Sequence, residues 1–435
     1  MLKFIRESRT FTAYFHNTGW IFAEKVLRLF FSFAVGIYVA RYLGPNDFGV
    51  LSFVLSLVMI GLPVSNLGLD TVLVKEFVKK ERSHQEIIGT GLFLRFAATV
   101  LVNVILFAIY KSHLYQGEIE QNLLFVLIAA NFFQVSNVFD FYFQSQVKAK
   151  FTSIAIASSV FISSLFRLYG ILTQKDLMFF GYSFIVEFGV LGLILLYFAL
   201  KLDVFKTALR LNKGYMKSLL KECWPLILSG ALISIYMKID QVMLKSLLDT
   251  RSVGNYSAAV KISEFWYVIP MTIGTSLFPL MTKNYHENLD LYMHRLKVIM
   301  GICFWSFLIL AIGLHLFSEL IISLLFGNDY TMAHEALRIH GYAGIITSMS
   351  IFFSQKFILD QKTKIYFVGT LFGAIANVGL NLWLIPLSGI SGAAWATVIS
   401  YGIPTIVVSI LYDKEIGLTY IRSVFYLLKA KRFKS

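Results

Sequence analysis

Residues 19–39 read GWIFAEKVLRLFFSFAVGIYV, an apolar run whose only charged residues are Glu24, Lys25 and Arg28. A helix needs about 20 mostly apolar residues to cross the hydrocarbon core of a bilayer, and this run has that length. It is also longer than the roughly 7–15 apolar residues of a cleavable signal peptide. We therefore expect it to be retained as a first transmembrane helix.

The composition extends this expectation to the whole chain. Hydrophobic residues make up 57% and charged residues 15% of the 435 residues, whereas roughly a quarter of the residues in soluble domains are charged. The excess of 39 Lys and Arg over 25 Asp and Glu gives a formal charge of +14, but these charges fall in short gaps between apolar runs. We therefore predict an integral membrane protein and exclude soluble folds and a nucleic-acid partner.

The sequence carries no motif for catalysis or for a bound cofactor. Cys223 and Cys303 have no CxxC or zinc-type spacing, and no Walker A, GxSxG, HExxH or Rossmann pattern occurs. We expect no cofactor, no metal site and no enzymatic activity. The two cysteines are interpreted as packing residues.

Further apolar runs of similar length follow the first one, separated by charged or turn residues. The fold class that we predict is an all-α integral membrane protein with about twelve transmembrane helices. The expected spans are 17–42, 48–74, 87–110, 121–143, 151–173, 177–200, 222–248, 252–282, 296–317, 335–359, 364–387 and 390–412.

Lys and Arg concentrate on one side of these spans. By the positive-inside rule this bias places both termini in the cytoplasm, and it supports an even number of spans. We interpret the two richest segments as topology determinants at an anionic leaflet. They are the middle loop, with Lys201, Lys206, Arg210, Lys213, Lys217 and Lys221, and the tail, with Lys414, Arg422, Lys429, Lys431, Arg432 and Lys434.

The middle loop divides the chain into two lobes of six helices each. We expect an N-terminal lobe at 1–205, a basic cytoplasmic linker at 206–221, a C-terminal lobe at 222–412 and a basic cytoplasmic tail at 413–435.

An internal repeat supports this division. LGPNDFGVLS at 43–52 aligns with LDTRSVGNYS at 248–257 and matches Gly49 with Gly254. Two halves that start on the same side of the membrane indicate parallel repeats, an architecture that favours a substrate site between the lobes.

Several stretches resemble one family of transporters. ARYLGPNDFGVLSFVLSLV at 40–58 is similar to the first outer turn and second helix of Wzx-type O-antigen and polysaccharide flippases. Residues 224–270, which include IDQVML and VGNYSAA, resemble their seventh and eighth helices. LFP at 277–279 and GISGAAWATVIS at 389–400 complete a pattern that extends over most of the chain.

This resemblance implies the fold of the multidrug/oligosaccharidyl-lipid/polysaccharide exporter superfamily, with two lobes around a central cavity lined by the first, second, seventh and eighth helices. It implies a flippase that moves an undecaprenyl-pyrophosphate-linked oligosaccharide across the bacterial inner membrane by alternating access. The oligosaccharide is an O-antigen or other surface-polysaccharide repeat unit, and the polyprenyl tail stays in membrane lipid. Coupling to H⁺ or Na⁺, and association with a polysaccharide polymerase and glycosyltransferases, are expectations that come with the same resemblance.

Basic side chains within the spans are candidates for substrate binding, because each costs about 2.5–3.5 kcal/mol at bilayer depth on insertion scales. Arg28, Lys238 and Lys261 lie on helices that the resemblance places around the cavity. We expect them to bind the pyrophosphate, whose charges are costly to leave unpaired away from water. Arg95 and Arg167 are weaker candidates, since each is within reach of a membrane interface by snorkelling.

Four carboxylates within the spans are candidates for ion coupling or for ion pairs: Glu24, Asp240, Glu264 and Glu187. Glu24 and Arg28 are four residues apart and Lys261 and Glu264 three apart, so each pair can meet on one helix face. Lys238 and Asp240 are two apart, so at least one needs a partner on another helix, a ligand or water. The alternative interpretation is that these charges are structural ion pairs that hold the helices together.

Aromatic and proline residues near these charges are also candidates. Tyr236 and Trp266 either pack between helices or stack on a sugar ring. Pro270 and Pro279 lie in the long eighth span, where a proline removes a backbone hydrogen bond and permits a kink. We interpret them as candidate hinges for alternating access.

Two other classes of function remain open. One is a multidrug or cation antiporter of the same fold, whose cavity should be acidic, whereas the cavity expected here is mixed and leans basic. The other is a membrane-embedded polysaccharide enzyme, which usually needs a larger loop outside the membrane than the basic middle loop of this chain.

Overall fold

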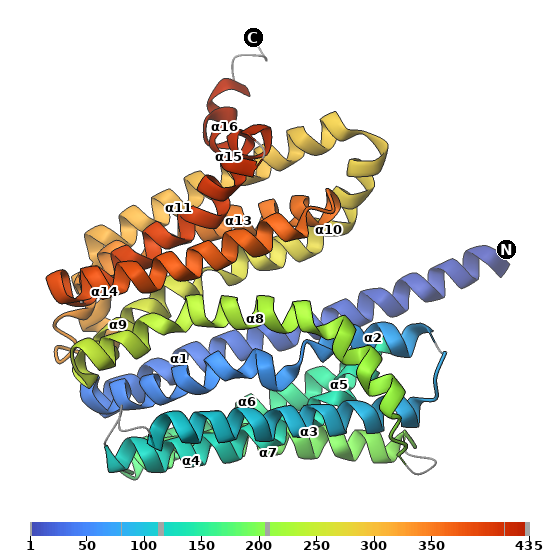
Figure 1. Ribbon diagram of the computed structural model, residues 1–435, viewed down its shortest axis with the longest axis horizontal. Helices are drawn as coiled ribbons and strands as arrows, with labels where there is room; N and C mark the ends of the chain where they lie inside the picture. The colour runs from blue at the N-terminus through green and yellow to red at the C-terminus, as the bar shows by residue number, and fades with distance from the viewer. Residues whose placement is uncertain (1, 80, 112–116, 205–208, 413, 431–435) are drawn as a thin grey trace. The chain divides into compact units, whose positions relative to one another are not determined.

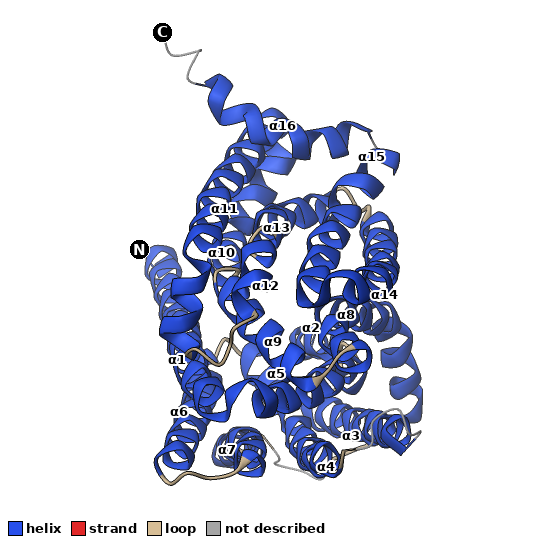
Figure 2. Cartoon of the chain, turned by 90° about the vertical axis from the view of Figure 1, so that its left-hand side faces the viewer, coloured by secondary structure: helices blue, strands red, loops and turns tan. Residues whose placement is uncertain are grey.

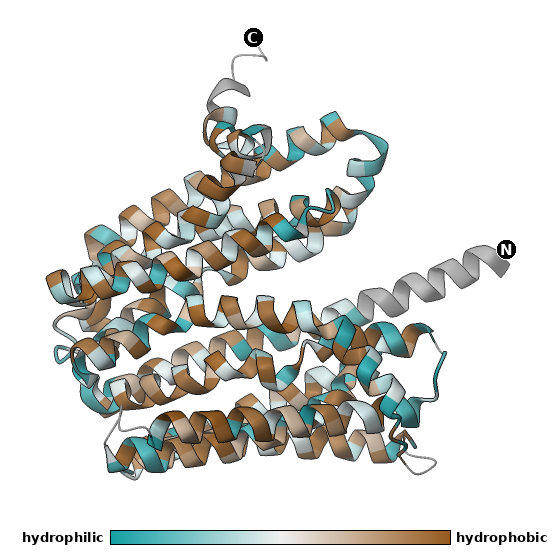
Figure 3. Ribbon diagram, viewed as in Figure 1, coloured by the Kyte–Doolittle hydropathy of each residue, from teal (hydrophilic) through white to brown (hydrophobic). Residues whose placement is uncertain are grey.

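The computed structural model describes residues 2–79, 81–111, 117–204, 209–412 and 414–430. Within these ranges every regular element is a helix, as Figure 2 shows. The predicted all-α fold class is confirmed. Hydrophobic residues extend along the helices, and hydrophilic residues gather where helices meet at their ends, as between α10 and α11 (Figure 3).

The chain forms two compact units. Unit 1 comprises Met1–Leu43 and Val54–Ser234, and unit 2 comprises Gly44–Phe53 and Ile235–Ser435. The lobe boundaries expected from the sequence divide the chain elsewhere and stay a prediction. Two helices, α1 and α8, contribute to both units.

Unit 1 is built around helix α7, which packs against both α4 and α6 (Figure 1). A hydrophobic core joins α2, α3, α5 and the start of α8. It includes Phe77, Ile87, Val138 and Leu219. The helices that enter unit 1 are α1 (Leu2–Asn66), α2 (Leu69–Lys79), α3 (His84–Ile109), α4 (Glu118–Phe133), the 3₁₀ turn η2 (Gln134–Ser136), α5 (Asn137–Ser145), α6 (Ala149–Leu172), α7 (Leu177–Lys201) and the first part of α8 (Lys213–Leu247).

Unit 2 is built around α11, which packs against α12, α13 and α16. Its core includes Met300, Phe353 and Tyr420. The remaining helices of unit 2 are α9 (Thr250–Phe265), α10 (Val268–Glu287), α11 (Leu289–Phe326), α12 (Ala333–His340), α13 (Ala343–Leu359), α14 (Thr363–Gly402), the π-helical turn η3 (Ile403–Val407), α15 (Val408–Tyr412) and α16 (Lys414–Ala430).

Nine helices of the described residues are long and apolar enough to cross a membrane. Two of them are interrupted at glycines in the left-handed region, Gly44 with φ 70° and Gly389 with φ 59°, a conformation that glycine adopts without steric cost. Each glycine separates two expected spans. If each of these two helices counts as two spans, the nine helices of the described residues provide eleven spans. Helices α9 and α10 together cover one further expected span, 252–282. The chain is thus a multi-pass membrane protein, consistent with about twelve spans.

A proline explains why α9 and α10 are separate helices. The helical path breaks at Trp266 and Tyr267, and Pro270 lies four residues after Trp266. A proline lacks the N–H that would bond the carbonyl four residues earlier, and its ring clashes with that carbonyl. Pro279 lies inside α10 without ending it.

Two repeat-related glycines lie against each other's helices in unit 2. A Cβ atom added at Gly49 would lie 1.8 Å from the carbonyl oxygen of Thr250, and one added at Gly254 would lie 1.9 Å from that of Pro45. Each glycine therefore meets the residue four positions before the other. Only residues without a side chain allow so close an approach of two backbones.

The last part of the expected basic linker is folded onto unit 1. Helix α8 already begins at Lys213. Just before it, the Asn212 amide donates to Glu86 at 2.9 Å, and the Arg82 guanidinium lies 4.4 Å above the Tyr215 ring. Lys206 lies outside the described residues.

The expected tail begins with helix α16, which packs on α11. Trp305 Nε1 donates to the Val424 carbonyl at 3.1 Å, and Ser423 on the same side of α16 is fully buried. Lys431, Arg432 and Lys434 of this segment lie outside the described residues.

Candidate functional site

Unit 1 contains a cavity of about 200 Å³ between α1, α5, α6 and α7. One group of lining residues is polar: Arg28, Asn137, Asp140, Thr152, Ser159 and Glu187. The other group is apolar: Ile156, Val160, Phe188, Leu191 and Leu195. A few polar groups on an apolar wall are typical of sites for small molecules.

A change of helix type brings Asp140 to the cavity. Helix α4 gives way to the 3₁₀ turn η2 before α5 begins at Asn137. Asp140 on α5 then accepts hydrogen bonds from Thr152 Oγ1 of α6 at 2.7 Å and from Gln144 Nε2 at 3.0 Å. Both carboxylate oxygens of Asp140 therefore have a neutral donor.

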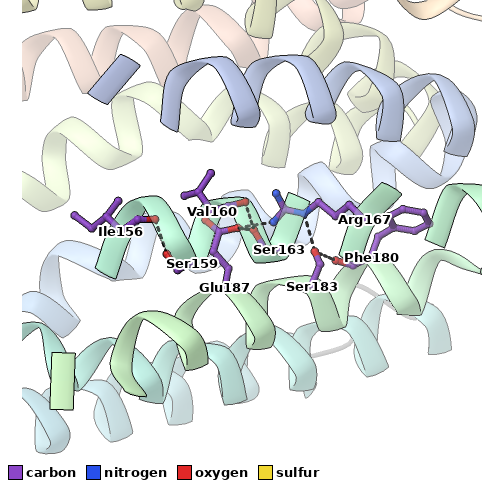
Figure 4. A network of polar contacts seen from close by, with 8 residues as sticks. All are labelled: Ile156, Ser159, Val160, Ser163, Arg167, Phe180, Ser183 and Glu187. Carbon is purple, nitrogen blue, oxygen red and sulfur yellow. Dashed lines mark hydrogen bonds and ion pairs between the residues drawn. The ribbon is translucent and has the colours of Figure 1, made fainter. Parts of the chain in front are cut away.

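Glu187 on α7 belongs to a network with α6, drawn in Figure 4. Its Oε2 lies 2.7 Å from Arg167 Nη2 and accepts a hydrogen bond from Ser163 Oγ at 3.1 Å. Arg167 Nε also donates to Ser183 Oγ at 2.9 Å, and the guanidinium lies 4.9 Å from the centre of the Phe184 ring. Arg167 is therefore held by protein side chains, and its expected reach to a membrane interface is not needed to satisfy its charge.

Arg28 and Glu24 form the ion pair expected from their spacing on α1. Arg28 Nε lies 2.9 Å from Glu24 Oε1, with side-chain exposures of 51% for Arg28 and 7% for Glu24. The arginine end of the pair lines the cavity, while the carboxylate is buried.

Arg95 is 2% exposed and lies inside unit 1. It donates to Asn66 Oδ1 at 2.6 Å, and its guanidinium is 5.5 Å from the Phe141 ring centre. The sequence placed Arg95 within reach of an interface, and in the structure its guanidinium bonds Asn66. It does not line the cavity that Arg28 lines.

Asp240 of α8 is 3% exposed and accepts three hydrogen bonds in unit 2. The donors are Tyr256 OH at 2.8 Å, Thr397 Oγ1 at 2.5 Å and Asn381 Nδ2 at 2.6 Å. They come from α9 and from both parts of α14, on either side of Gly389. Asn381 also donates to Asn377 Oδ1 at 3.1 Å. Helix contacts thus surround one carboxylate with neutral polar groups.

The sequence alone did not point to the three donors around Asp240. Tyr256 and Thr397 stand inside quoted motifs, VGNYSAA and GAAWATVIS, where we assigned them no role. Asn377 and Asn381 are four residues apart in an apolar span, and such a pair on one face of a membrane helix was a signal that could have identified them.

The other predicted residues of unit 2 lie near this group in sequence but have different partners. Lys238 Nζ lies 3.8 Å from Glu264 Oε2, so Glu264 pairs across helices. Lys261 is half-buried on α9.

The predicted aromatic residues of unit 2 both have aromatic neighbours. Tyr236 stacks on Tyr401 with ring centres 4.4 Å apart. Trp266 lies edge-on to Phe265 at the break between α9 and α10. The first contact joins α8 to α14, whereas the second joins neighbours in the sequence. The choice between helix packing and sugar stacking stays a prediction.

Family comparisons match most of the chain. A model described as "Polysaccharide biosynthesis protein" matches residues 15–285, and one described as "MatE" matches residues 225–383. A "Putative O-antigen transporter" of Shigella dysenteriae is 29% identical over 186 residues, which cover 42% of this chain and 44% of that protein. A "Probable low-salt glycan biosynthesis flippase Agl15" of Haloferax volcanii is 22% identical over 39% of this chain and 36% of that protein. The chain thus spans less than half the length of these two relatives.

Solved structures share the fold at low sequence identity. An inward-facing multidrug resistance MATE family transporter gives a TM-score of 0.72 at 17% identity and covers 90% of this chain and 95% of its own. The lipid II flippase MurJ in an inward closed conformation gives 0.70 at 14% identity, covering 96% and 95%. These likenesses show that the chain has the fold of membrane transporters.

Proposed function

The chain belongs to the polysaccharide biosynthesis protein family, the Wzx-type flippases of the multidrug/oligosaccharidyl-lipid/polysaccharide exporter superfamily, and from this premise we propose its substrate and mechanism. It translocates an undecaprenyl-pyrophosphate-linked oligosaccharide, a repeat unit of O-antigen or another surface polysaccharide, across the bacterial inner membrane. Both termini are cytoplasmic, and transport proceeds by alternating access. A polysaccharide polymerase and glycosyltransferases act alongside it.

The observation that carries this proposal is the polar cavity among membrane-spanning helices of unit 1. Polar groups that are buried away from water cost free energy unless they form hydrogen bonds. Polar side chains in a cavity inside the membrane are therefore expected where they bind a polar substrate. Arg28, Asn137 and Glu187 line this cavity. An oligosaccharide supplies hydroxyl groups for such side chains.

Arg28, Lys238 and Lys261 are the residues that we propose for the pyrophosphate. Arg28 is half-exposed and engages Glu24 through Nε, so its terminal amino groups are available for charge-assisted hydrogen bonds to phosphate oxygens. The 3.8 Å contact between Lys238 and Glu264 is longer than a hydrogen bond, so the ammonium can exchange partners at low cost.

Asp240 is the residue that we propose for the coupling ion. Three of the four candidate carboxylates, Glu24, Glu187 and Glu264, lie next to a basic side chain. Among the described residues Asp240 has only neutral donors, and Asn381 Oδ1 beside it is buried without a hydrogen-bond partner. A bound proton or a Na⁺ held by these oxygens would compensate the buried charge.

Complementation of surface polysaccharide in a flippase-deficient strain tests the proposal. Arg28→Ala, Lys238→Ala and Lys261→Ala should each reduce the polysaccharide at a normal level of the protein. Lys283→Ala is the control, because Lys283 forms an exposed pair with Glu287. Full complementation by all three variants would remove the proposed anion site.

The multidrug antiporter remains the rival function. The cavity that we expected to lean basic lies between the lobes, and it stays a prediction. The cavity inside unit 1 is a different one, lined by one guanidinium and two carboxylates, and Lys238 and Lys261 belong to unit 2. Resistance to cationic compounds in the same strain, without restored polysaccharide, would favour the antiporter.

A further inference from the structure

Helix α16 is fixed to unit 2 by one of its faces. Trp305 Nε1 of α11 donates to the Val424 carbonyl at 3.1 Å, and the Tyr420 hydroxyl donates to the Ile346 carbonyl of α13 at 3.3 Å. Ser423, next to Val424, is fully buried. These contacts to two helices define which face of α16 is turned away from unit 2.

That outer face of α16 is apolar and has basic residues at its borders. Ile421 and Phe425 are 39% and 53% exposed, and their spacing of four residues places them on one side of the helix. Arg422 is exposed at the border of this side, and Lys414 is exposed near its N-terminal end. A helix of this kind lies in a membrane interface, with its apolar side chains among the acyl chains and its basic side chains at the headgroups.

The direction of α16 also fits an interfacial helix. It has 17 residues and is not one of the nine helices in the described part of the chain that are long and apolar enough to cross a membrane. Figures 1 and 2 show that it runs across the direction of α11 and not along it. Because α11 is one of the nine, a helix that runs across it lies along the plane of the membrane.

Basic groups of α11 and α16 meet at one tyrosine beside the apolar face. The Tyr426 hydroxyl lies 2.7 Å from His294 Nδ1, and Lys297 Nζ lies 5.8 Å from the centre of the Tyr426 ring. Arg422 precedes Tyr426 by four residues, on the same side of α16. Among the side chains that the structure describes, no carboxylate forms an ion pair with Lys297. A phosphate accepts charge-assisted hydrogen bonds from such a group of donors.

This end of unit 2 is positively charged as a whole. The Tyr285 hydroxyl donates to Asp360 at 2.8 Å and joins the end of α10 to the end of α13. Two ion pairs there are neutral, Lys283 with Glu287 and Lys356 with Asp360. The other acidic residues of these segments and of α16 with the residue before it are Asp290, Asp413 and Glu415, and the other basic ones are Arg295, Lys297, Lys362, Lys364, Lys414, Arg422 and Lys429. The excess of basic residues favours an anionic lipid over a zwitterionic one.

We infer that α16 lies in a membrane interface and that Lys297 and Arg422 bind the headgroup phosphate of an anionic phospholipid. The acyl chains of that lipid pack beside Ile421 and Phe425. The ligand is a lipid and not a free phosphate, because the cations adjoin an exposed apolar face. This site is separate from the proposed flippase site and does not depend on which substrate is transported.

The full-length protein in a neutral detergent tests the inference when it is titrated with phosphatidylglycerol or with phosphatidylcholine of the same acyl chains. Native mass spectrometry counts the lipid molecules that stay bound. Each cation near an anionic headgroup contributes roughly fivefold to binding, so we expect a preference for phosphatidylglycerol of about tenfold or more. Lys297→Gln and Arg422→Gln should each lower this preference roughly fivefold. Ile421→Ser combined with Phe425→Ser should weaken the binding of both lipids and leave the preference unchanged.

Arg295→Gln is the matched control. Arg295 is two residues before Lys297 on α11, so it points to a different side of that helix, and its loss should leave the preference unchanged. An equal loss in the Arg295 variant would replace the site by a general attraction of charges. An unchanged preference in folded Lys297→Gln and Arg422→Gln proteins would also overturn the inference.

Glycerol phosphate separates the two sources of a phosphate group. At the concentration of the lipid it should not displace phosphatidylglycerol, and displacement would assign the cations to a soluble phosphate. Wild-type binding of both lipids by the Ile421 and Phe425 double variant would show that this face does not contact lipid, and would overturn the placement of α16. No readout here involves transport, so each of these results leaves the proposed flippase function standing.

Discussion

Replacing Gly254 by Ala introduces a methyl group where two helices of unit 2 approach most closely. The added carbon would lie 1.9 Å from the Pro45 carbonyl oxygen, well inside the 3.0 Å that real Cβ contacts respect. The obstacle is backbone, so no side chain can rotate away, and the helices must separate by about 1 Å. Overpacking of this kind costs roughly 1–3 kcal/mol, and we expect the upper end of that range.

An opposing term has to be subtracted from this cost. Ala is favoured over Gly in a helix by about 1 kcal/mol, which leaves a net loss of about 2 kcal/mol in the free energy of unfolding. Gly313→Ala is the matched control, because nothing lies within 4 Å of a Cβ at that position in α11. It should be neutral or slightly stabilising.

Equilibrium unfolding of the purified protein in mixed micelles, followed by circular dichroism, measures both variants. Gly49→Ala should cost about as much as Gly254→Ala, since its contact with the Thr250 carbonyl is equally close. The double variant should cost less than the sum, because one separation of the helices relieves both clashes. If Gly254→Ala is no less stable than Gly313→Ala, the close approach of these backbones is refuted.

Three further predictions concern the polar residues and the prolines. Asp240→Asn should abolish ion-dependent transport in proteoliposomes while the protein remains inserted, because its amide carries no charge for an ion to compensate; full transport under an ion gradient would exclude Asp240 as the coupling residue. Arg167→Gln should lower the free energy of unfolding by about 1–3 kcal/mol, less than the loss of a partner in a fully buried pair. Adding Glu187→Gln to the same chain should restore part of this free energy. If unfolding in micelles gives the single and the double variant equal stability, the pair contributes nothing. Replacing Pro270 and Pro279 together by Ala should leave insertion intact and slow transport, and an unchanged transport rate would argue against a hinge.

The helices themselves were predictable from the sequence because the bilayer imposes a length on them. The expected spans 17–42 and 48–74 lie on either side of Gly44, which supplies the turn inside α1. The second span continues past the end of α1 at Asn66 into α2. The expected spans 364–387 and 390–412 likewise lie on either side of Gly389 in α14, and the second includes η3 and α15. A run of apolar residues and a glycine are local signals, and they need no knowledge of neighbouring helices.

The partners of charged residues were only partly predictable. Glu24 and Arg28 meet as their spacing on one helix indicates. Glu264 lies next to Lys238 of α8, a contact that depends on how two helices pack. Of the donors to Asp240, Tyr256 is 16 residues away in the sequence and Asn381 is 141 residues away, and no local pattern encodes that they meet.

Helix α8 determines where this chain can be cut into fragments. Its first part packs on unit 1, where a Cβ at Gly68 would lie 2.6 Å from Leu226 and one at Gly230 would lie 2.9 Å from Pro63. A fragment that ends before Lys213 would leave that surface of α1 bare and become a substrate for membrane proteases. Co-expression of a second fragment that begins at Lys213 should protect the first fragment from degradation, because residues 213–234 cover the exposed surface again.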